Sequence, residues 1–270
     1  MAINTLECAK IFQDGLDAQM LATATSAWME ANATQVIYNG GDEVKMPEIS
    51  TAGLATYDRD SGFVQGAVTL KFGTYKLTQD RGRSFSLDAM SVDETNFVAS
   101  SGNVMGEFQR LQVVPEVDAY RYSRIAALAK GASQEKATFT PTADNILAQL
   151  DDDITAVQDI VGDDESLVIV MNRKVRTILN NAKGIQKFID TGDFTAGTVT
   201  TKVRTYNEIP IIGVPSARMK TQYVFNNGTT SGQEAGGFKA DTQAKDINWI
   251  VIAQRAPIAV SKTDKVRIFT

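Results

Sequence analysis

The stretch Ala67-Val-Thr-Leu-Lys-Phe72, followed by Tyr75-Lys-Leu-Thr78, decides how the fold is interpreted. Apolar and polar residues alternate in both pieces, which is typical of half-buried β-strands. Upstream, residues 35–38 and 43–46 flank a glycine-containing turn and predict a hairpin that Pro47 should end. The section from 35 to 87 has few residues that could fill a core, and a two-stranded ribbon is marginal alone in water. We therefore expect it to lie on the body of the protein or on a neighbour.

Composition places the chain among globular proteins and excludes many enzyme classes. Hydrophobic residues make up 43% of its 270 residues and charged residues 22%, unlike a disordered chain. With a net charge of −5, the chain lacks the excess of basic residues that is typical of a dedicated nucleic-acid-binding protein. Cys8 is the single cysteine, which excludes an internal disulfide. Histidine is absent, which excludes Ser-His-Asp and Cys-His catalysis and nearly every zinc or haem site. Catalysis by carboxylates, lysine or tyrosine remains, or no catalysis at all.

The sequence predicts neither a targeting segment nor a membrane span. Charged residues interrupt the apolar ones over residues 1–19, so no signal-peptide core is expected. No apolar stretch approaches the ~20 residues of a membrane helix. With one free cysteine, this pattern favours a soluble protein kept in a reducing compartment.

Helical periodicity appears in three places. Residues 5–31 carry an apolar stripe that includes Phe12 and Leu16, which should pack on another subunit or, equally, on the protein's own core. Residues 93–131 predict two helices or one long kinked helix, because Pro115 interrupts the pattern and suits a first helical turn. Thr142 is expected to cap a third helix, with a buried stripe of Ile146, Leu147, Leu150, Ile154, Val157 and Val161.

Residues 143–225 alternate helix and strand like a compact α/β unit. The run Leu167-Val-Ile-Val-Met171 predicts a buried strand, and Asn172 should cap the helix after it. Residues 192–203 are expected to form a loop and residues 208–215 a strand. The apolar segments 247–253 and 266–269 should be strands that return to a sheet elsewhere.

No residue is assigned to catalysis, a metal or a cofactor. Asp58 and Asp60 flank Arg59 as paired glycosidase acids sometimes do, but in a polar loop such a pair is usually solvated. Asp151-Asp152-Asp153 point about 100° apart on a helix and cannot converge on one ion, so a solvated face is expected.

Two charged groups are instead candidates for contacts between subunits. Arg81 and Arg83 lie between Asp80 and Asp88, where an ion-pair network at a contact surface is favoured over an anion site. A second group should form interlocking salt bridges along a helical spine. At an interface these bridges would fix the orientation of one subunit relative to the next. Its members are Arg110, Glu116, Asp118, Arg121 and Arg124. Phe12, Leu16, Tyr57 and Arg59 complete the expected interface set.

The order of these parts resembles the major capsid protein fold that tailed phages, herpesviruses and encapsulins share. Several segments are similar to major capsid proteins of phages and prophages of Gram-positive bacteria, in order and over nearly the whole chain. They are Asp80-Arg-Gly-Arg-Ser-Phe-Ser-Leu-Asp88, Asp93-Glu-Thr95, Phe108-Gln-Arg110, Val113-Val-Pro-Glu-Val-Asp-Ala-Tyr120 and Ile209-Pro-Ile-Ile-Gly-Val-Pro215.

The resemblance implies an α+β fold with four parts. These are an N-terminal arm (1–32), an extended two-stranded loop (33–87), a peripheral domain with a spine helix (88–142 and 236–270) and an axial domain (143–235). It implies hexamers and pentamers that close into an icosahedral shell around double-stranded DNA, with scaffolding and portal proteins as partners and no membrane, cofactor or enzymatic activity. Such a subunit would assemble in the host cytoplasm and reside in the virion. An encapsulin-type shell holding an enzyme is the alternative, and a carboxylate-dependent hydrolase is a remote one.

The resemblance also bears on the C-terminal strand. Related capsid proteins typically continue past the point matching Val266-Arg-Ile-Phe-Thr270, so this chain either closes its sheet differently or is truncated. In both cases we expect residues 266–269 to pair within their own sheet or with a neighbouring subunit, because an unpaired apolar edge promotes association.

Overall fold

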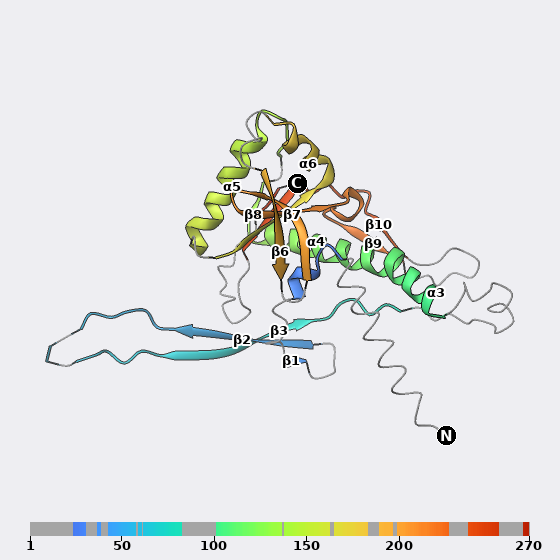
Figure 1. Cartoon of the computed structure of the whole chain (residues 1–270). Helices are drawn as coiled ribbons and strands as arrows, with labels where there is room; N and C mark the ends of the chain where they lie inside the picture. The colour runs from blue at the N-terminus through green and yellow to red at the C-terminus, as the bar shows by residue number, and fades with distance from the viewer. Residues whose placement is uncertain are drawn as a thin grey trace, which may run out of the picture.

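A computed structural model describes residues 24–30, 37–38, 43–57, 59–60, 62–82, 101–136, 138–162, 165–182, 189–196, 199–226, 237–253 and 267–269. In these residues the predicted α+β class is confirmed: helices accompany a seven-stranded sheet, a three-stranded sheet and a two-stranded sheet (Figure 1). Five residues singled out in the sequence lie outside the described residues: Phe12, Leu16, Asp58, Arg83 and Asp88.

The seven-stranded mixed sheet is the centre of the body, with strand order β4-β12-β11-β5-β8-β7-β6. Strand β5 pairs in parallel with β8, with α6 between them in the chain, and antiparallel with β11. The C-terminal strand β12 pairs with β11 and β4, so the expected pairing within its own sheet is confirmed. The bounds are β4 Glu135–Lys136, β5 Leu167–Asn172, β6 Ile189–Ala196, β7 Val199–Tyr206, β8 Ile209–Val214, β11 Trp249–Ala253 and β12 Arg267–Phe269.

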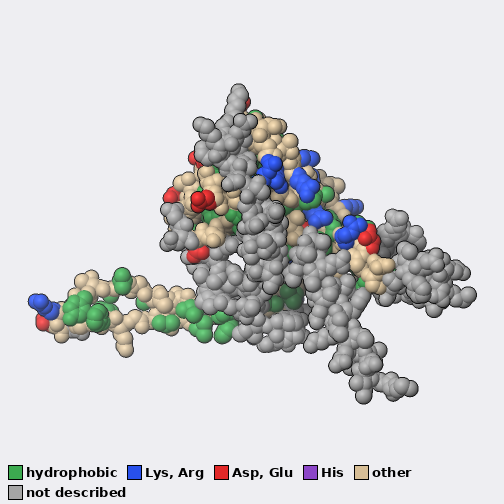
Figure 2. All heavy atoms as spheres, in the orientation of Figure 1, with side chains coloured by type: hydrophobic (Ala, Val, Ile, Leu, Met, Phe, Trp, Pro, Cys, Tyr) green, Lys and Arg blue, Asp and Glu red, His purple; other side chains and the backbone are tan. Residues whose placement is uncertain are grey.

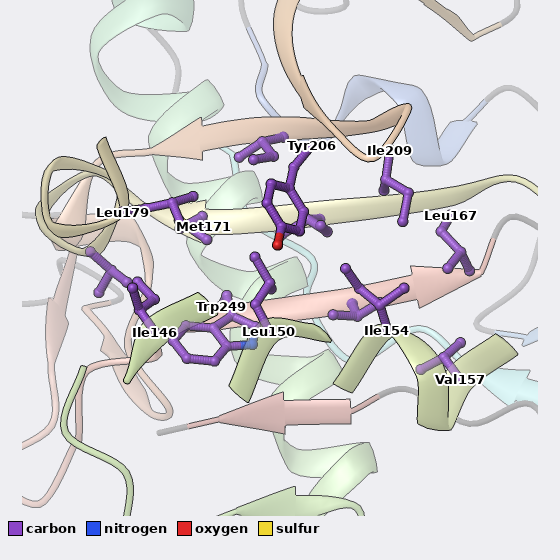
Figure 3. Close-up of a cluster of buried hydrophobic side chains, with 14 of the residues drawn as sticks. Ile146, Leu150, Ile154, Val157, Leu167, Met171, Leu179, Tyr206, Ile209 and Trp249 are labelled. Carbon is purple, nitrogen blue, oxygen red and sulfur yellow. The ribbon is translucent and has the colours of Figure 1, made fainter. Parts of the chain in front are cut away.

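Helices cover both faces of this sheet. Successive side chains of β5 point to opposite faces and pack against different helices. Leu167, Ile169 and Met171 pack with α5 (Ile146–Val161) and α6 (Arg173–Asn180) in the cluster drawn in Figure 3. Val168 and Val170 point to the other face, where they pack against the long helix α4. Because both faces are covered, every residue of β5 is buried and the strand is uniformly apolar up to Asn172, as the sequence predicts.

One long helix runs beneath the sheet. It consists of α3 (Ser101–Phe108), a π-helical turn η3 (Gln109–Val113) and α4 (Val114–Gly131). Pro115 stands just after the π-turn, where the N–H of Val114 bonds to the carbonyl of Gln109. The wider turn accommodates a proline that lacks an N–H and would otherwise crowd the preceding turn. Of the two alternatives in the sequence, the single helix is therefore correct.

The ribbon predicted from residues 35–78 is present. Strand β2 (Glu43–Thr51) pairs antiparallel with β3 (Val68–Lys76) over its full length, and β1 (Ile37–Tyr38) adds a short edge to β2. Pro47 does not end the strand, contrary to expectation: it pairs with Phe72 at a point where β1 no longer covers β2. Proline is tolerated on edge strands of a sheet, and among the described residues β1 pairs with β2 only at Val44 and Lys45.

Two further expectations are wrong in detail, and one is confirmed. Residues 192–203 are not a loop, because β6 and β7 form a hairpin with a register from Ile189–Tyr206 to Ala196–Val199. The helix α5 begins at Ile146 with Asn145 as its N-cap, and Thr142 lies one turn earlier, where its carbonyl accepts from the N–H of Ile146. Asn172 does cap α6, accepting at Oδ1 from the Lys174 N–H at 3.0 Å.

The run Asp151-Asp152-Asp153 is not a uniformly solvated face. Asp153 is fully buried and accepts from Trp249 Nε1 at 3.0 Å and from Gln149 Nε2 at 2.8 Å. Asp151 accepts from the Tyr206 hydroxyl at 2.7 Å. Two of the three carboxylates therefore tie α5 to strands of the sheet. Asp152 is exposed, like Asp151, but forms no such bond with any described residue.

Replacing Asp153 with alanine should lower the free energy of unfolding by roughly 2 kcal/mol, because the buried indole N–H of Trp249 loses its acceptor. Asp152→Ala, one residue away on the exposed side, should change it by less than about 0.5 kcal/mol. Urea unfolding of both variants measures the difference. Equal effects would contradict the structural role given to Asp153.

Candidate assembly surfaces

Asp118, on α4, lies at the junction of three chain segments and is fully buried. Its Oδ1 accepts from the Ser26 N–H at 3.1 Å and the Ser26 hydroxyl at 2.7 Å. Its Oδ2 accepts from the Thr25 N–H at 3.2 Å, the Thr25 hydroxyl at 2.8 Å and Arg218 Nη1 at 3.0 Å. The carboxylate thus joins the short helix η1 (Ala27–Glu30) and the turn η5 (Ser216–Arg218) to the long helix.

Further bonds close this junction, which we call the arm junction (Thr25, Ser26, Asp118, Arg121, Tyr122 and Arg218). Arg121 Nη1 donates to the Ser26 carbonyl at 3.2 Å and to its hydroxyl at 3.0 Å. The Tyr122 hydroxyl donates to Thr25 Oγ1 at 3.2 Å. Burial raises the pKa of Tyr122 and the charge of Asp118 raises it further, so the phenol stays protonated as a donor. The network fixes where the chain from residue 24 onward meets the body.

The expected salt-bridge network along the spine is not what the structure shows. Arg110 pairs with Glu107, three residues earlier on the exposed side of the same helix. Glu116 pairs with Arg81 and Asp118 pairs with Arg218, so both ion pairs lead away from the helix to distant segments. Arg218 was not among the expected site residues, since nothing in the sequence links positions 100 residues apart.

Arg81 anchors the base of the ribbon to the body of its own chain. Besides its ion pair with Glu116, it donates from Nη2 to the Asn226 carbonyl at 2.9 Å. Its guanidinium carbon lies 5.7 Å from the centre of the Phe225 ring. Nearby, the hydroxyls of Thr78 and Tyr120 lie 2.6 Å apart. In the isolated chain the ion pair of Arg81 is thus internal and sets the direction in which the ribbon leaves, and a contact of Arg81 across subunits stays a prediction.

The ribbon also contacts the hairpin of β9 (Tyr223–Phe225) and β10 (Phe238–Ala240) through Arg81. Aromatic rings gather at this point: the Phe225 ring centre lies 6.0 Å from that of Tyr120 and 6.5 Å from that of Phe238. Rings at these separations attract one another. The base of the ribbon is thus packed and hydrogen-bonded.

Beyond its base, the ribbon presents an apolar face to solvent, and Figure 2 shows hydrophobic side chains along it. In the register of β2 and β3, Val68 lies opposite Thr51, Leu70 opposite Ile49 and Phe72 opposite Pro47, so the six share one face. Val68 is 73% exposed, Leu70 55% and Phe72 52%. Over the same stretch the other face carries Ser50, Thr69 and Lys71, and nearer the base it carries Val44 and Tyr75. The ribbon is therefore amphipathic, yet its apolar face is not covered by the body.

The loop that joins β2 to β3 is apolar in part as well. Tyr57 and Phe63 are exposed and pack on each other with ring centres 5.0 Å apart, and Leu54 is fully exposed. Arg59 and Asp60 lie in an exposed turn of this loop. Tyr57 and Arg59, both expected at an interface, are thus at the surface of the isolated chain.

Neither a metal-binding cluster nor a membrane-spanning helix is found in the described residues. They contain no group of three or more His, Cys, Asp or Glu residues that could hold a metal ion. None of the helices in the described part of the chain is long and apolar enough to cross a membrane.

Comparison with known proteins does not assign the chain to a family. No protein-family model matches the chain, and the comparison with curated proteins gave no match. The function must therefore be argued from the surfaces of the molecule itself.

Replacing Asp118 with alanine should lower the free energy of unfolding by about 3–5 kcal/mol, because Arg218 and four other donors lose a buried acceptor. Hydrogen exchange at the Thr25 and Ser26 amides should accelerate. Glu107→Ala removes an exposed carboxylate from the same long helix and should hardly change the free energy of unfolding. A similar cost for both variants would show that the arm junction does not hold the chain.

Arg81→Ala should destabilise the subunit by about 1–2 kcal/mol, since a half-buried ion pair and a bond to a backbone carbonyl are lost together. Arg110→Ala, which removes only an exposed pair, serves as the control and should hardly change the melting temperature. Thermal unfolding of dilute protein measures both. If Arg81→Ala left the melting temperature of the dilute protein unchanged, the internal anchor would be wrong.

Proposed function

We propose that this protein is a structural subunit of an icosahedral phage capsid, which assembles with copies of itself into hexamers and pentamers around double-stranded DNA. The observation that carries the proposal is the amphipathic ribbon of β2 and β3. The similarity of several segments to phage major capsid proteins supports the same function. Scaffolding and portal proteins would be its partners, and the virion its final location.

The apolar face of the ribbon favours association. Val68, Leu70 and Phe72 are each more than half exposed, although each would gain about 1 kcal/mol or more on burial. A two-stranded ribbon is also marginally stable without a surface to cover one face. Both costs disappear when the apolar face lies on another subunit.

The anchored base of the ribbon prepares it for such a contact. Arg81 and Thr78 hold the point of departure through Glu116 and Tyr120 of α4. A segment held in its binding direction loses less conformational entropy on binding than a free one. The internal ion pair therefore supports assembly indirectly, by orienting the apolar face.

Double-stranded DNA would be enclosed without sequence-specific binding. The net charge of −5 provides no long basic surface along which a duplex could bind. The proposal thus requires contacts between subunits rather than affinity for the genome.

The test compares two ribbon variants by sedimentation velocity and negative-stain microscopy, with scaffolding protein supplied. Leu70→Ser with Phe72→Ser should abolish capsomers and shells while hardly changing the melting temperature of the dilute subunit, because both side chains are exposed. Thr69→Ser with Lys71→Ser, on the opposite face, is the matched control and should assemble like the parent protein.

Protease protection gives a second measure of the same contact. The loop between β2 and β3 should be cut in free subunits and protected in shells. A parent protein that stays monomeric at all concentrations and salts would overturn the proposed function. Shells that enclose an enzyme instead of DNA would replace the phage capsid with an encapsulin-type compartment.

A further inference from the structure

The first turn of α6 concentrates positive charge where a helix disfavours it. The helix begins Arg173-Lys174-Val175-Arg176 and has no acidic residue in its first turn. The helix dipole places positive charge at this end, so each basic side chain is in an unfavourable position. Arg204 of β7 adds a fourth positive charge and donates from Nη1 to Asn180 Oδ1 at 2.9 Å.

These charges are not neutralised within the described part of the chain. Among the described residues, Arg173, Lys174 and Arg176 form no ion pair. The Arg176 guanidinium lies against β8, where a Cβ at Gly213 would come within 2.5 Å of Nη1. Burial lowers the pKa of Arg176, and the charges of Arg204 and Arg173 lower it further. We call these four residues the basic cluster (Arg173, Lys174, Arg176 and Arg204). An acidic partner would relieve the repulsion among them.

The same molecule carries an acidic surface on α5. Asp152 and Asp159 are both exposed, and two helical turns, about 10 Å, separate them. Among the described residues neither forms an ion pair or a hydrogen bond. On the face shown in Figure 2, Lys and Arg side chains gather over α6 and down the slope towards β9 and β10, whereas Asp and Glu side chains lie over α5 on the other side.

We propose that the partner of the basic cluster is a second copy of this chain, with Arg173 and Lys174 of one subunit facing Asp152 and Asp159 of the next. The inference rests on the proposed self-assembly and specifies one of its contacts. Two complementary patches on different sides of one molecule make a head-to-tail contact, and repetition of such a contact closes a ring. Charges of this kind set orientation, while the apolar ribbon supplies most of the affinity.

Charge balance favours this partner over a nucleic acid. The basic cluster has four positive charges, whereas tight binding to a duplex typically uses about 6–10 phosphate contacts. The chain as a whole is acidic, so a second copy always brings the carboxylates that the cluster needs.

Two charge-reversal variants test the contact. The first carries Arg173→Glu with Lys174→Glu, and the second carries Asp152→Lys with Asp159→Lys. All four side chains are exposed, so circular dichroism and melting should show folded subunits. Each variant alone should associate at least roughly tenfold more weakly than the parent protein, because both of its patches then have the same sign.

An equimolar mixture of the two variants should recover association, since each reversed patch then meets its complement. In the mixture the variants must alternate around a ring, which permits hexamers but not pentamers. Lys130→Glu with Lys245→Glu makes the same change in net charge as the first variant, at exposed positions outside both patches, and should assemble normally.

The outcomes separate this inference from the proposed function. Shells formed equally well by the parent and by each variant alone would overturn the head-to-tail contact and leave the capsid function standing. Failure of the mixture to recover association would also overturn it, because the two patches would not face each other. A first variant that assembles normally but loses binding to a labelled DNA duplex would assign the basic cluster to phosphate instead. A parent protein that never assembles would remove the proposed function itself.

Discussion

The buried carboxylate of Asp118 is the interaction on which the arrangement of the molecule depends. A charge without access to water is tolerated only when hydrogen bonds and an opposite charge replace the lost hydration. Here those partners come from residues 25 and 26 and from Arg218, segments that approach α4 from opposite ends of the chain. Folding therefore requires all three segments to meet, which fixes the N-terminal segment and the β8–β9 connection against the same helix.

Around this junction the body of the protein satisfies its own hydrophobic surfaces. The two faces of β5 and β11 pack into separate clusters, one with α5 and α6 and one with α4 and Trp28. Neither cluster needs the ribbon, whose apolar side chains belong to neither of them. The residues that stabilise the subunit thus differ from the ribbon residues that, in the proposed assembly, would contact a neighbour. This separation allows a ribbon variant to fold normally and still fail to associate.

Local patterns made much of the fold predictable from the sequence. The apolar run of β5, the buried stripe of α5, the cap at Asn172 and the strand β3 are each visible in a short window, and each is confirmed. The expected half-burial of β3 is not found in the isolated chain, where the strand is exposed on both faces. The β6–β7 hairpin was not predicted, because its sequence is rich in threonine and glycine and lacks an alternation of apolar and polar residues, although threonine favours strands. The burial of Asp153 was not predictable from the local sequence, because it depends on Trp249, nearly a hundred residues away.

The candidate site was less predictable than the fold for the same physical reason. Charged residues such as Arg81, Glu116 and Asp118 were recognisable as important, but an ion pair is defined by both of its members, and sequence spacing does not reveal the second. Arg81 lies 35 residues from Glu116, and in the isolated chain this pair orients the ribbon. The apolar face of the ribbon, by contrast, follows from periodicity alone once the register is known. It is exposed in the isolated subunit, and this exposure is the observation from which we propose a contact with a second chain.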